Sequence, residues 1–506
     1  MIAESFPAAS SPPLPCHWLA QAAARWPEKP LIQGPDKISF QEAQTRVDAL
    51  ASWMQGQGIV KGDRVVIVMP NRSEVMLLCL AALQQGIIFS ILSHQMQPEG
   101  LQRILSQCEP RMVFLDDSTA HLGATLPGTA WLSVEGEEWT SLFLTSAPAA
   151  APVEADPEDI AFLVFTSGST GTPRGVMLSQ GNVAFVSTAI LARLHYEAGD
   201  CIGIFLPLAF DYSLYQLFYA CLTGASLHVG RPEMVGPELP KILAREGITV
   251  LPGVPSVFAA LIKMQRYRPT ELPALRMITN TGDHLPLAYI GQVQSLLPQV
   301  KVFPMFGLTE CKRVSILLPE ELSAQPDSVG RPLDGTTVFA VDAEGQRLPP
   351  GTAGELVIQG PHVSAGYWRA PEETARRFRD LDGERTLFSG DQGSVDEQGY
   401  ITFHSRSDFV IKHRGTRLSP AEVEEAACSV PQVLAAGCVK DEPRDLLFLF
   451  VSTTQETMNE AEVLKALSNR LERGKLPDRV IFLPDLPRTG NQKLDRKALR
   501  QLLTTV

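Results

Sequence analysis

The sequence predicts an α/β protein with a large N-terminal domain, residues 1–407, and a small C-terminal domain, residues 408–506. Helical and strand patterns alternate through the first two thirds of the chain, which is typical of a layered fold in which helices cover sheets. From about residue 330 the pattern changes to short strands separated by glycine turns, which indicates a small β-rich subdomain up to residue 407. Residues 408–506 have the mixed pattern of a compact α+β unit.

Periodicity justifies the elements of the first third. Residues 40–56 have the apolar spacing of a helix that ends at glycines, and residues 65–70 (VVIVMP) have the composition of a short buried strand. The apolar stretch 75–92 is interrupted by two glutamines and a glycine, so we expect a buried helix followed by a strand and not a membrane span. Residues 145–158 are rich in alanine and proline and indicate a surface linker, which the apolar strand IAFLVF follows.

Composition and charge exclude some classes of function. The chain has 506 residues, 44% of them hydrophobic and 20% charged, with a formal net charge of -12. A nucleic-acid-binding protein needs a basic face, so this balance argues against one. The eight cysteines form no C-x-x-C pair, and we expect reduced, buried thiols. The N-terminal segment has neither a basic start nor an apolar core, so we expect no signal peptide and a cytoplasmic location.

The segment from Phe165 to Gly175 (FTSGSTGTPRG) is the strongest candidate for a binding loop. It follows a predicted strand, and its glycines allow consecutive backbone N–H groups to point into one anion-sized hollow. The spacing differs from that of a mononucleotide-binding P-loop. The sequence therefore predicts a loop that holds a triphosphate. Its glycines are Gly168, Gly171 and Gly175, its hydroxyl residues are Thr166, Ser167, Ser169, Thr170 and Thr172, and its cation is Arg174.

Together with five further segments, this loop resembles the adenylate-forming superfamily of acyl-CoA synthetases, nonribosomal peptide synthetase adenylation domains and luciferases. The segments follow in the family's order: Phe306-Gly-Leu-Thr-Glu310, Gly354-Glu-Leu to Gly366-Tyr-Trp368, Leu387-Phe-Ser-Gly-Asp391, Arg406-Ser-Asp408 with Lys412, and Arg488-Thr-Gly-Asn-Gln-Lys493. The resemblance implies stacked mixed sheets with helices, a small β-barrel subdomain and a mobile α+β C-terminal domain. It also implies ATP and Mg²⁺ as cofactors and an AMP-forming acid–thiol ligase as the enzyme.

The resemblance assigns a role to each segment. Lys493 is expected to bridge the substrate carboxylate and the α-phosphate, where a compact cation suits the developing charge. Glu310 is expected to bind Mg²⁺, and Thr309 to contact phosphate. The remaining ATP contacts are expected from Phe306 and Gly307 at adenine, Asp391 at the ribose hydroxyls and Arg406 near the ribose and phosphates. Asp408 matches the hinge at which the C-terminal domain turns between adenylation and thiolation.

Two positions depart from the family pattern, and neither change removes a needed group. Arg174 stands where the family usually has lysine, and Ser405 stands where glycine commonly precedes Arg406. The segment from Asn280 to Asp283 also differs from the usual small-residue run beside adenine.

Asp211 is the most informative residue for the choice of acid. It lies where the resemblance to amino-acid adenylation domains puts the carboxylate that binds the substrate's α-amino group. No lysine or arginine occurs between Cys201 and Gly230, so we expect the substrate's ammonium to be its partner. Alignment with the family adds a largely apolar lining that suits a small or cyclic amino acid, proline first. The lining residues are Tyr212, Tyr215, Pro252, Ile278, Asn280, Met305 and Val314.

The acceptor thiol is expected on a separate carrier protein, with CoA as the alternative, because no carrier domain follows Lys493 in this sequence. Free-standing prolyl, D-alanyl or glycyl carrier-protein ligases are the types considered. An acyl-CoA synthetase for a non-amino acid, or a binding protein that has the fold without the activity, remain the alternatives. No nucleic acid or membrane is expected as a partner.

Overall fold

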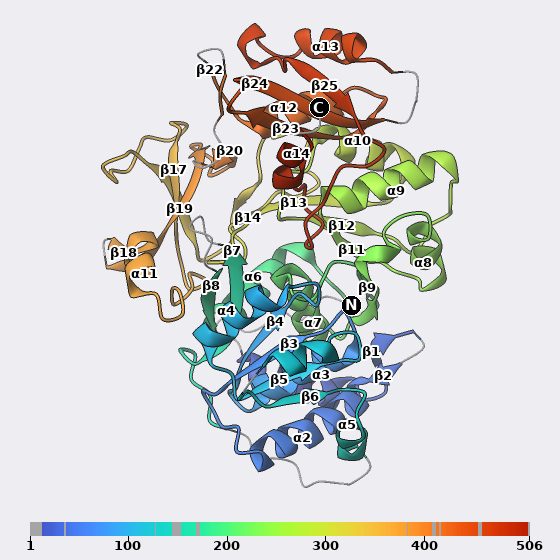
Figure 1. Cartoon of the computed structure of the whole chain (residues 1–506), viewed down its shortest axis with the longest axis vertical. Coiled ribbons are helices and arrows are strands. Elements are labelled where there is room, and N and C mark those ends of the chain that lie inside the picture. The colour runs from blue at the N-terminus through green and yellow to red at the C-terminus, as the bar shows by residue number, and fades with distance from the viewer. Residues whose placement is uncertain are drawn as a thin grey trace.

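The computed structural model describes residues 13–34, 37–126, 128–143, 153–167, 173–381, 383–406, 411–413, 416–453 and 458–503. Two large sheets with their covering helices form the body of the molecule in Figure 1, a smaller sheet lies to one side, and the C-terminal part sits above the body. Residues 407–410 are not among the described residues, and the predicted hinge Asp408 is one of them.

A nine-stranded sheet forms the centre of the body and carries the parallel strands on which the candidate site is built. Its inner strands β1, β10, β9, β11, β12 and β13 run parallel, while β2, β14 and β15 are antiparallel at the edges. In spatial order the strands are β15 (Arg331–Pro332), β14 (Ser315–Ile316), β13 (Lys301–Phe306), β12 (Met277–Asn280), β11 (Val250–Gly253), β9 (Cys201–Ile204), β10 (Ser226–Val229), β1 (Pro30–Gln33) and β2 (Ile38–Ser39).

A six-stranded sheet packs beside it and ends in the hairpin β7–β8. Its first five strands are parallel, and their near-continuous apolar runs are typical of strands that are buried on both faces. In spatial order the strands are β6 (Trp131–Ser133), β5 (Met112–Leu115), β3 (Arg64–Val68), β4 (Ile88–Leu92), β7 (Ile160–Ser167) and β8 (Pro173–Ser179).

Helices cover these sheets where apolar periodicity predicts them. The helix expected at 40–56 is α2, which begins with a reciprocal capping box between Ser39 and Glu42. The stretch 75–92 folds as the buried helix α3 followed by β4, as expected. The body helices are α1 (Trp18–Arg25), α2 (Phe40–Gly56), α3 (Ser73–Gln84), α4 (Pro98–Cys108), α5 (Glu137–Leu142), α6 (Gln180–Leu194), α7 (Asp211–Thr223), α8 (Leu239–Arg245), α9 (Pro255–Tyr267) and α10 (Leu287–Leu296), with 3₁₀ turns η1 (Pro15–His17), η2 (Ala120–Thr125) and η3 (Pro232–Met234).

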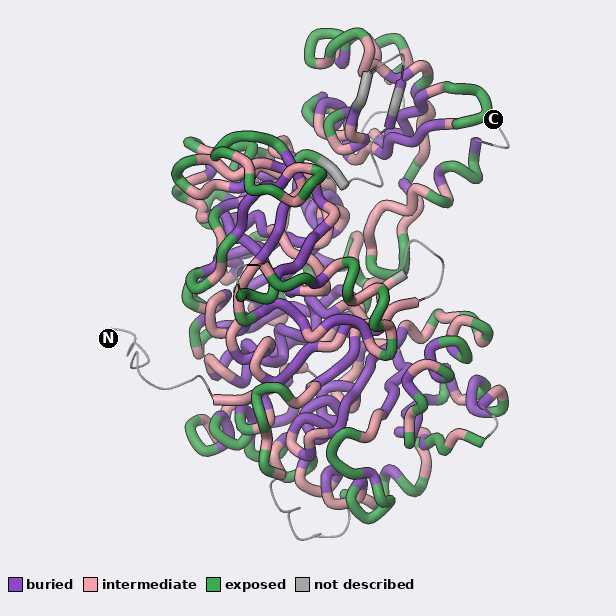
Figure 2. Tube along the Cα trace, turned by 90° about the vertical axis from the view of Figure 1, so that its left-hand side faces the viewer, coloured by how far each residue is buried: buried purple, intermediate pink, exposed green. Residues whose placement is uncertain are grey.

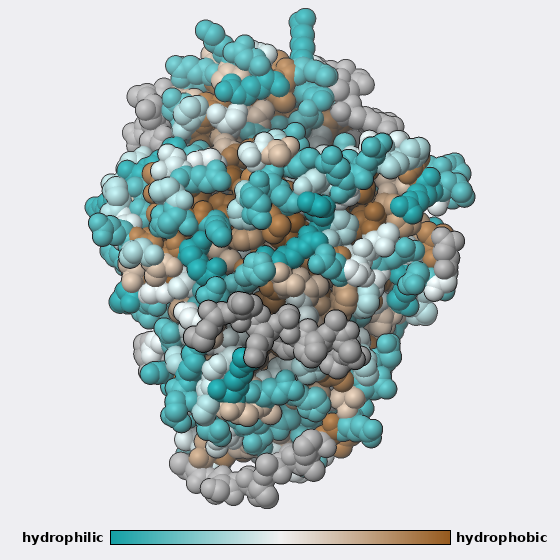
Figure 3. All heavy atoms as spheres, turned by 180° about the vertical axis from the view of Figure 1, so that it is seen from behind, coloured by the Kyte–Doolittle hydropathy of each residue, from teal (hydrophilic) through white to brown (hydrophobic). Residues whose placement is uncertain are grey.

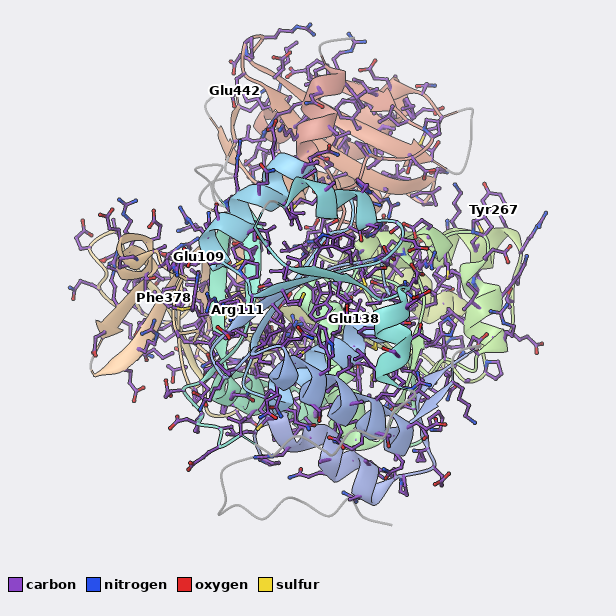
Figure 4. All side chains as sticks on the ribbon, turned by 60° about the horizontal axis from the view of Figure 1, so that its bottom comes forward. Glu109, Arg111, Glu138, Tyr267, Phe378 and Glu442 are labelled. Atoms are coloured by element: carbon purple, nitrogen blue, oxygen red, sulfur yellow. The ribbon has the colours of Figure 1, made fainter. Side chains whose placement is uncertain are left out.

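The β-rich subdomain consists of a five-stranded antiparallel sheet and one short helix. In Figure 4 the labelled Phe378 marks this sheet, which stands to one side of the body. Its elements are β16 (Thr337–Val341), β17 (Gly354–Gln359), α11 (Pro371–Arg377), β18 (Phe378–Leu381), β19 (Glu384–Val395) and β20 (Ile401–Arg406).

The C-terminal part has a core of its own, and Figure 2 shows its buried strands separated from the larger buried core of the body. Its three-stranded sheet is covered by α12, α13 and α14, so the expected α+β pattern is present. The elements are β21 (Ile411–His413), β22 (Thr416–Leu418), α12 (Pro420–Cys428), β23 (Val433–Asp441), β24 (Leu446–Thr453), α13 (Glu460–Ser468), η5 (Arg473–Lys475), β25 (Arg479–Phe482) and α14 (Arg496–Leu502).

The cysteines and the surface agree with the composition. All eight cysteines are free thiols, and seven of them are buried, as expected, whereas Cys16 is half-buried. In the part of the chain that the structure describes, every helix is too short or too polar to span a bilayer. The face in Figure 3 is mostly hydrophilic, with apolar residues showing between polar ones, and the large exposed apolar side chains are scattered along the sequence.

Candidate active site

The candidate site lies at the carboxyl edge of the nine-stranded sheet. Because β9, β11, β12 and β13 are parallel, the segments that follow them meet at one edge. These segments contain Asp211 after β9, Asn280 at the end of β12 and Phe306 at the end of β13. The sheet topology thus brings together residues that are far apart in the sequence.

The hairpin β7–β8 supports the predicted triphosphate loop. Thr166 pairs with Arg174, and Phe165 with Gly175, so the two ends of the loop are held in register. A Cβ on Gly175 would lie 3.1 Å from Cζ of Phe165, which explains the glycine at this position. Gly168, Ser169, Thr170, Gly171 and Thr172 lie outside the described residues, as does the side chain of Ser167.

A tight loop between β13 and β14 carries Thr309 and Glu310. A Cβ on Gly307 would lie 2.3 Å from the carbonyl oxygen of Lys312, so no other residue fits there. The half-buried Glu310 accepts a 2.7 Å hydrogen bond from the Tyr367 hydroxyl on Oε1. The described residues contain no cluster of three carboxylate, imidazole or thiol groups that could hold a metal. A lone carboxylate fits Mg²⁺, which commonly binds one or two carboxylates together with substrate phosphates.

The predicted adenosine contacts come from three strands, β13, β19 and β20. Phe306, at the end of β13, has its ring centroid 5.6 Å from that of Phe403. Asp391 on β19 is buried, and its backbone N–H donates to the Ser389 hydroxyl at 3.0 Å. Arg406 is the β20 residue paired with Asp391, which brings the two predicted ribose-binding positions side by side, although the Arg406 side chain lies outside the description.

Lys493 reaches the same edge from the C-terminal part. It sits on the long loop after β25, which in Figure 1 dips from the C-terminal part toward the body. The Ser256 hydroxyl at the start of α9 donates to the Gln492 carbonyl at 2.8 Å and fixes this loop. The Lys493 ammonium then lies 5.1 Å from the ring centroid of Phe210, the neighbour of Asp211. A Cβ on Gly282 would approach Lys493 Cε to 3.0 Å.

Side chains also join the C-terminal part to the body. Glu425 on α12 accepts from the Leu287 backbone N–H at 2.9 Å and lies 2.9 Å from His284 Nε2. Burial acts to lower the pKa of His284, but the hydrogen bond and charge of Glu425 outweigh it and raise that pKa above its ordinary value. The His284 side chain keeps 40% of its surface exposed, so water partly screens this pair. Tyr289 also donates to the Leu434 carbonyl.

Asp211 has a cation partner within the chain, and this corrects the expectation from the sequence. Lys312 Nζ lies 3.2 Å from Asp211 Oδ2, and both side chains are buried. Lys312 has φ of 62°, a left-handed conformation that is uncommon outside glycine and often marks functional loops. Burial lowers the pKa of Lys312 to about 8, with Asp211 acting to raise it and Arg313 to lower it.

A second buried cation lies next to this pair. Arg313 is 1% exposed, donates to the Thr281 hydroxyl and has Cζ 5.6 Å from the Tyr212 ring centroid. Lys312 Nζ lies 4.2 Å from the ring centroid of Tyr215. The Tyr212 hydroxyl donates to the Thr279 carbonyl at 2.8 Å. The region therefore contains two cations and one carboxylate away from water.

Several polar atoms here have no hydrogen-bond partner among the described residues. They are the Tyr215 hydroxyl, Arg313 Nε and Asn280 Oδ1, and all three are buried. Unpaired buried polar groups are costly in a folded protein, so a ligand that pairs them is the natural explanation. The other expected lining residues are also buried near this edge: Pro252 on β11, Ile278 on β12, Met305 on β13 and Val314 before β14.

The expected lining was thus incomplete. The predicted lining, which is largely apolar with two phenols and one amide, does not include Lys312 and Arg313. These residues lie 101 and 102 positions after Asp211 in the sequence. One signal was available: two consecutive cations directly follow the predicted metal ligand in Thr309-Glu310-Cys311-Lys312-Arg313.

Family comparison agrees with this geometry. The AMP-binding enzyme family matches residues 19–368, and the AMP-binding enzyme C-terminal domain matches residues 422–493. The chain belongs to the AMP-binding enzyme family. It is accordingly an AMP-forming ligase, of the kind found as adenylation domains and acyl-CoA synthetases, and adenylate-forming enzymes use ATP.

The relatives add detail about the kind of enzyme. A dimodular nonribosomal peptide synthase of Bacillus subtilis is 28% identical over 96% of this AMP-binding enzyme, which covers 21% of the synthase. The chain therefore spans about a fifth of the length of that curated relative, and smaller fractions, 7% and 6%, of two further synthases.

Solved structures of the family superpose on it. A complex of VinN with L-aspartate is 33% identical, with a TM-score of 0.72 over 78% of this chain and 99% of VinN. ATP-bound MatB from Rhodopseudomonas palustris is 25% identical, with a TM-score of 0.83 over 96% of this chain and 98% of MatB. The AMP-binding enzyme is thus of the nonribosomal-peptide adenylation kind.

Proposed function

We propose that this AMP-binding enzyme activates an amino acid with a second acidic group as its adenylate, and then transfers the aminoacyl group to the phosphopantetheine thiol of a separate carrier protein. One observation carries the choice of substrate: Asp211 pairs with the buried Lys312, and a second buried cation, Arg313, follows Lys312 and donates to the Thr281 hydroxyl.

The charges of the pocket are complementary to such a substrate. A buried charge without a partner costs several kcal/mol, on the order of the penalty for breaking a buried ion pair, so the second cation calls for an anion. A side-chain carboxylate of the substrate can accept from Lys312 and from the unpaired donors Tyr215 Oη and Arg313 Nε. The substrate's ammonium can donate to Asp211 and to Asn280 Oδ1.

The comparisons favour the same class of substrate. VinN is 33% identical to this chain, and its solved complex contains L-aspartate, an amino acid with two carboxylates. Proline, the first expectation from an apolar lining, has no acidic group to pair with the excess cation. We therefore propose an aspartate-like amino acid in its place.

The chain's own residues supply the requirements of adenylation. An oxygen of the substrate carboxylate bonds to the α-phosphorus of ATP, and the bond from that phosphorus to the oxygen that bridges to the β-phosphate breaks, releasing pyrophosphate. Lys493 neutralises charge between the two anions, and Thr166, Arg174 and the loop between them hold the phosphates. Mg²⁺ bound by Glu310 would add charge neutralisation at the triphosphate. Phe306, Asp391 and Arg406 orient the nucleoside.

The second step consumes the adenylate. The thiolate sulfur bonds to the acyl carbon, and AMP leaves with the bonding electrons of the acyl–oxygen bond. A turn of the C-terminal part about Asp408 would withdraw Lys493 and admit the thiol. The peptide synthases among the relatives support a carrier protein as the thiol donor, with CoA as the alternative.

ATP–pyrophosphate exchange across all amino acids and representative fatty and aryl acids tests the proposal. We expect L-aspartate or a close analogue to give the highest kcat/KM. Asparagine, which lacks the second charge, and succinate, which lacks the ammonium, should each be at least about 10-fold poorer, since a hydrogen bond to a charged group contributes roughly 1.5–3 kcal/mol. Proline as the best substrate would refute the acidic-substrate proposal, and exchange with fatty or aryl acids alone would favour an acyl-CoA synthetase.

A further inference from the structure

The segment from Ser364 to Trp368 connects the triphosphate loop to the proposed metal ligand. It runs along β8, the strand that leaves the loop, as an additional antiparallel stretch. The Met177 N–H donates to the Gly366 carbonyl at 2.9 Å, and the Trp368 N–H donates to the Gly175 carbonyl at 2.7 Å. The exit of the triphosphate loop is therefore fixed by this segment.

The same segment holds Glu310 by its backbone and by its carboxylate. The Ser364 N–H donates to the Glu310 carbonyl at 2.8 Å. The Tyr367 hydroxyl donates to Glu310 Oε1 at 2.7 Å. Among the described residues, Tyr367 is the one side chain that donates a hydrogen bond to this carboxylate, and it does so on Oε1, so Tyr367 sets the orientation of Oε2 as well.

The Tyr367 ring is itself held from several sides. It is 3% exposed, and its centroid lies 5.5 Å from that of Phe378 in an edge-to-face arrangement. The Arg174 guanidinium carbon lies 5.7 Å from the ring centroid, a cation–π distance. The Tyr367 N–H donates to the Thr374 hydroxyl at 3.0 Å. A phenol held in this way cannot follow a carboxylate that rotates.

Glycine at position 366 makes this approach possible. Its φ is 111°, and a Cβ there would lie 2.4 Å from Cγ2 of Thr374. The backbone can therefore turn directly before Tyr367 and direct the ring between Arg174 and Glu310. Tyr367 thus touches one residue proposed to bind the triphosphate and another proposed to bind its metal.

We propose that Tyr367 is a positioning residue that orients the Glu310 carboxylate for the metal–triphosphate complex. Because its segment pairs with β8, where the triphosphate loop ends, Tyr367 also fixes the position of this carboxylate relative to the loop. The proposal rests on the proposed function only in that Glu310 binds Mg²⁺ together with ATP. Tyr367 does not touch substrate; it acts through Glu310.

Binding of ATP, measured by calorimetry without amino acid, tests this role independently of turnover. We expect Tyr367→Phe to weaken ATP binding roughly 10-fold in the presence of Mg²⁺, the effect of one hydrogen bond to a charged group, and to leave binding in EDTA unchanged. Tyr400→Phe is the matched control, because the Tyr400 hydroxyl donates to Glu321 Oε1 at 2.9 Å away from the loop. This control should bind ATP as the wild type does under both conditions.

A double-mutant cycle separates the two proposals. If Tyr367 acts through Glu310, the Y367F change should add little to Glu310→Gln. A Glu310→Gln variant with unchanged Mg²⁺ dependence would refute the metal role of Glu310. The role of Tyr367 alone would be refuted if Glu310→Gln reduces the Mg²⁺ dependence of ATP binding while Y367F binds ATP as the wild type does. It would also be refuted if Y367F loses the same ATP affinity in Mg²⁺ and in EDTA.

A second variant covers the case in which Y367F does not fold well enough to measure. Phe378→Leu removes the edge contact to the ring and keeps the hydroxyl. We expect a smaller loss than in Y367F, about 2- to 5-fold, again confined to Mg²⁺-dependent binding, because the hydroxyl remains and only the edge contact that holds the ring is lost. Unchanged Mg²⁺-dependent binding in Phe378→Leu would overturn the proposal that the held ring orients Glu310.

Discussion

Replacement of Lys312 by methionine separates a role in substrate choice from a role in folding. The change keeps most of the buried volume and removes the cation that lies 3.2 Å from Asp211. Asp211 is 6% exposed and would be left without this partner. If the proposed function is right, the variant should lose preference for an acidic substrate as well as stability.

The two effects have different magnitudes. Removal of one member of a buried ion pair costs about 3–5 kcal/mol, because the remaining charge stays buried. We therefore expect Lys312→Met to lower the free energy of unfolding by about that amount and Asp211→Asn/Lys312→Met to recover most of it. A lost hydrogen bond to the substrate carboxylate is worth roughly 1.5–3 kcal/mol, so kcat/KM for L-aspartate should fall about 10- to 100-fold.

Pyrophosphate exchange with L-aspartate and L-asparagine measures kcat/KM for each substrate, and urea unfolding measures the free energy of unfolding. The ratio of kcat/KM for aspartate to that for asparagine should fall at least about 10-fold in Lys312→Met, because asparagine lacks the carboxylate charge. Lys440→Met is the control for loss of a lysine away from the site, since Lys440 is also only 8% exposed and pairs with Asp445 in the C-terminal part. The Asp445 side chain is 74% exposed, so this change should cost little stability. Equal losses for both substrates would mean that Lys312 only neutralises Asp211 and would refute its role in substrate choice.

Three further predictions concern the remaining steps. Lys493→Ala should remove most adenylation while thioester formation from a supplied aminoacyl-adenylate survives, and equal loss of both half-reactions would contradict the bridging role. Asp391→Asn should raise KM for ATP roughly 10-fold with KM for the amino acid unchanged, because only the ribose contact loses a charge; a change in the amino-acid KM would place Asp391 elsewhere. The His284–Glu425 pair is fully formed below about pH 6.5 and is lost as pH rises through the raised pKa of His284. From pH 6 to pH 8 the ratio of thiolation to adenylation should therefore rise about 2-fold more in the wild type than in Glu425→Gln, in which ionisation of the acceptor thiol alone raises it.

Local sequence signals predict the elements of the fold accurately where one physical rule dominates. Residues 40–56 form α2 with the predicted bounds because an apolar stripe, the Ser39–Glu42 capping box and terminal glycines all agree. The β-rich subdomain was expected from its glycine turns, but its helix α11 (Pro371–Arg377) was not. That helix is seven residues long and has no buried side chain, so it carries little apolar periodicity to detect.

The site could be predicted only where the residues form contiguous motifs. Glu310 and Lys493 stand in segments whose spacing is distinctive, whereas the partner of Asp211 depends on the tight turn that returns the chain from β13 to β14. Lysine is almost never fully buried, so Lys312 has no composition signal that would place it inside. The Tyr367–Glu310 contact likewise requires the pairing of the Gly366 segment with β8.

The energetics of the Asp211–Lys312 pair argue that it serves binding more than folding. Replacing a buried ion pair by apolar residues of similar volume is often neutral or stabilising, so folding alone gives no reason to keep it. Arg313 adds a second buried cation. The Tyr215 ring centroid lies 4.2 Å from Lys312 Nζ, and the buried Tyr215 hydroxyl has no hydrogen-bond partner among the described residues. Each of these groups raises the free energy of the folded protein, and under the proposed function each would be paired by one substrate with an ammonium and a second carboxylate. A site of this kind discriminates strongly, because a neutral amino acid would leave its buried polar groups unpaired.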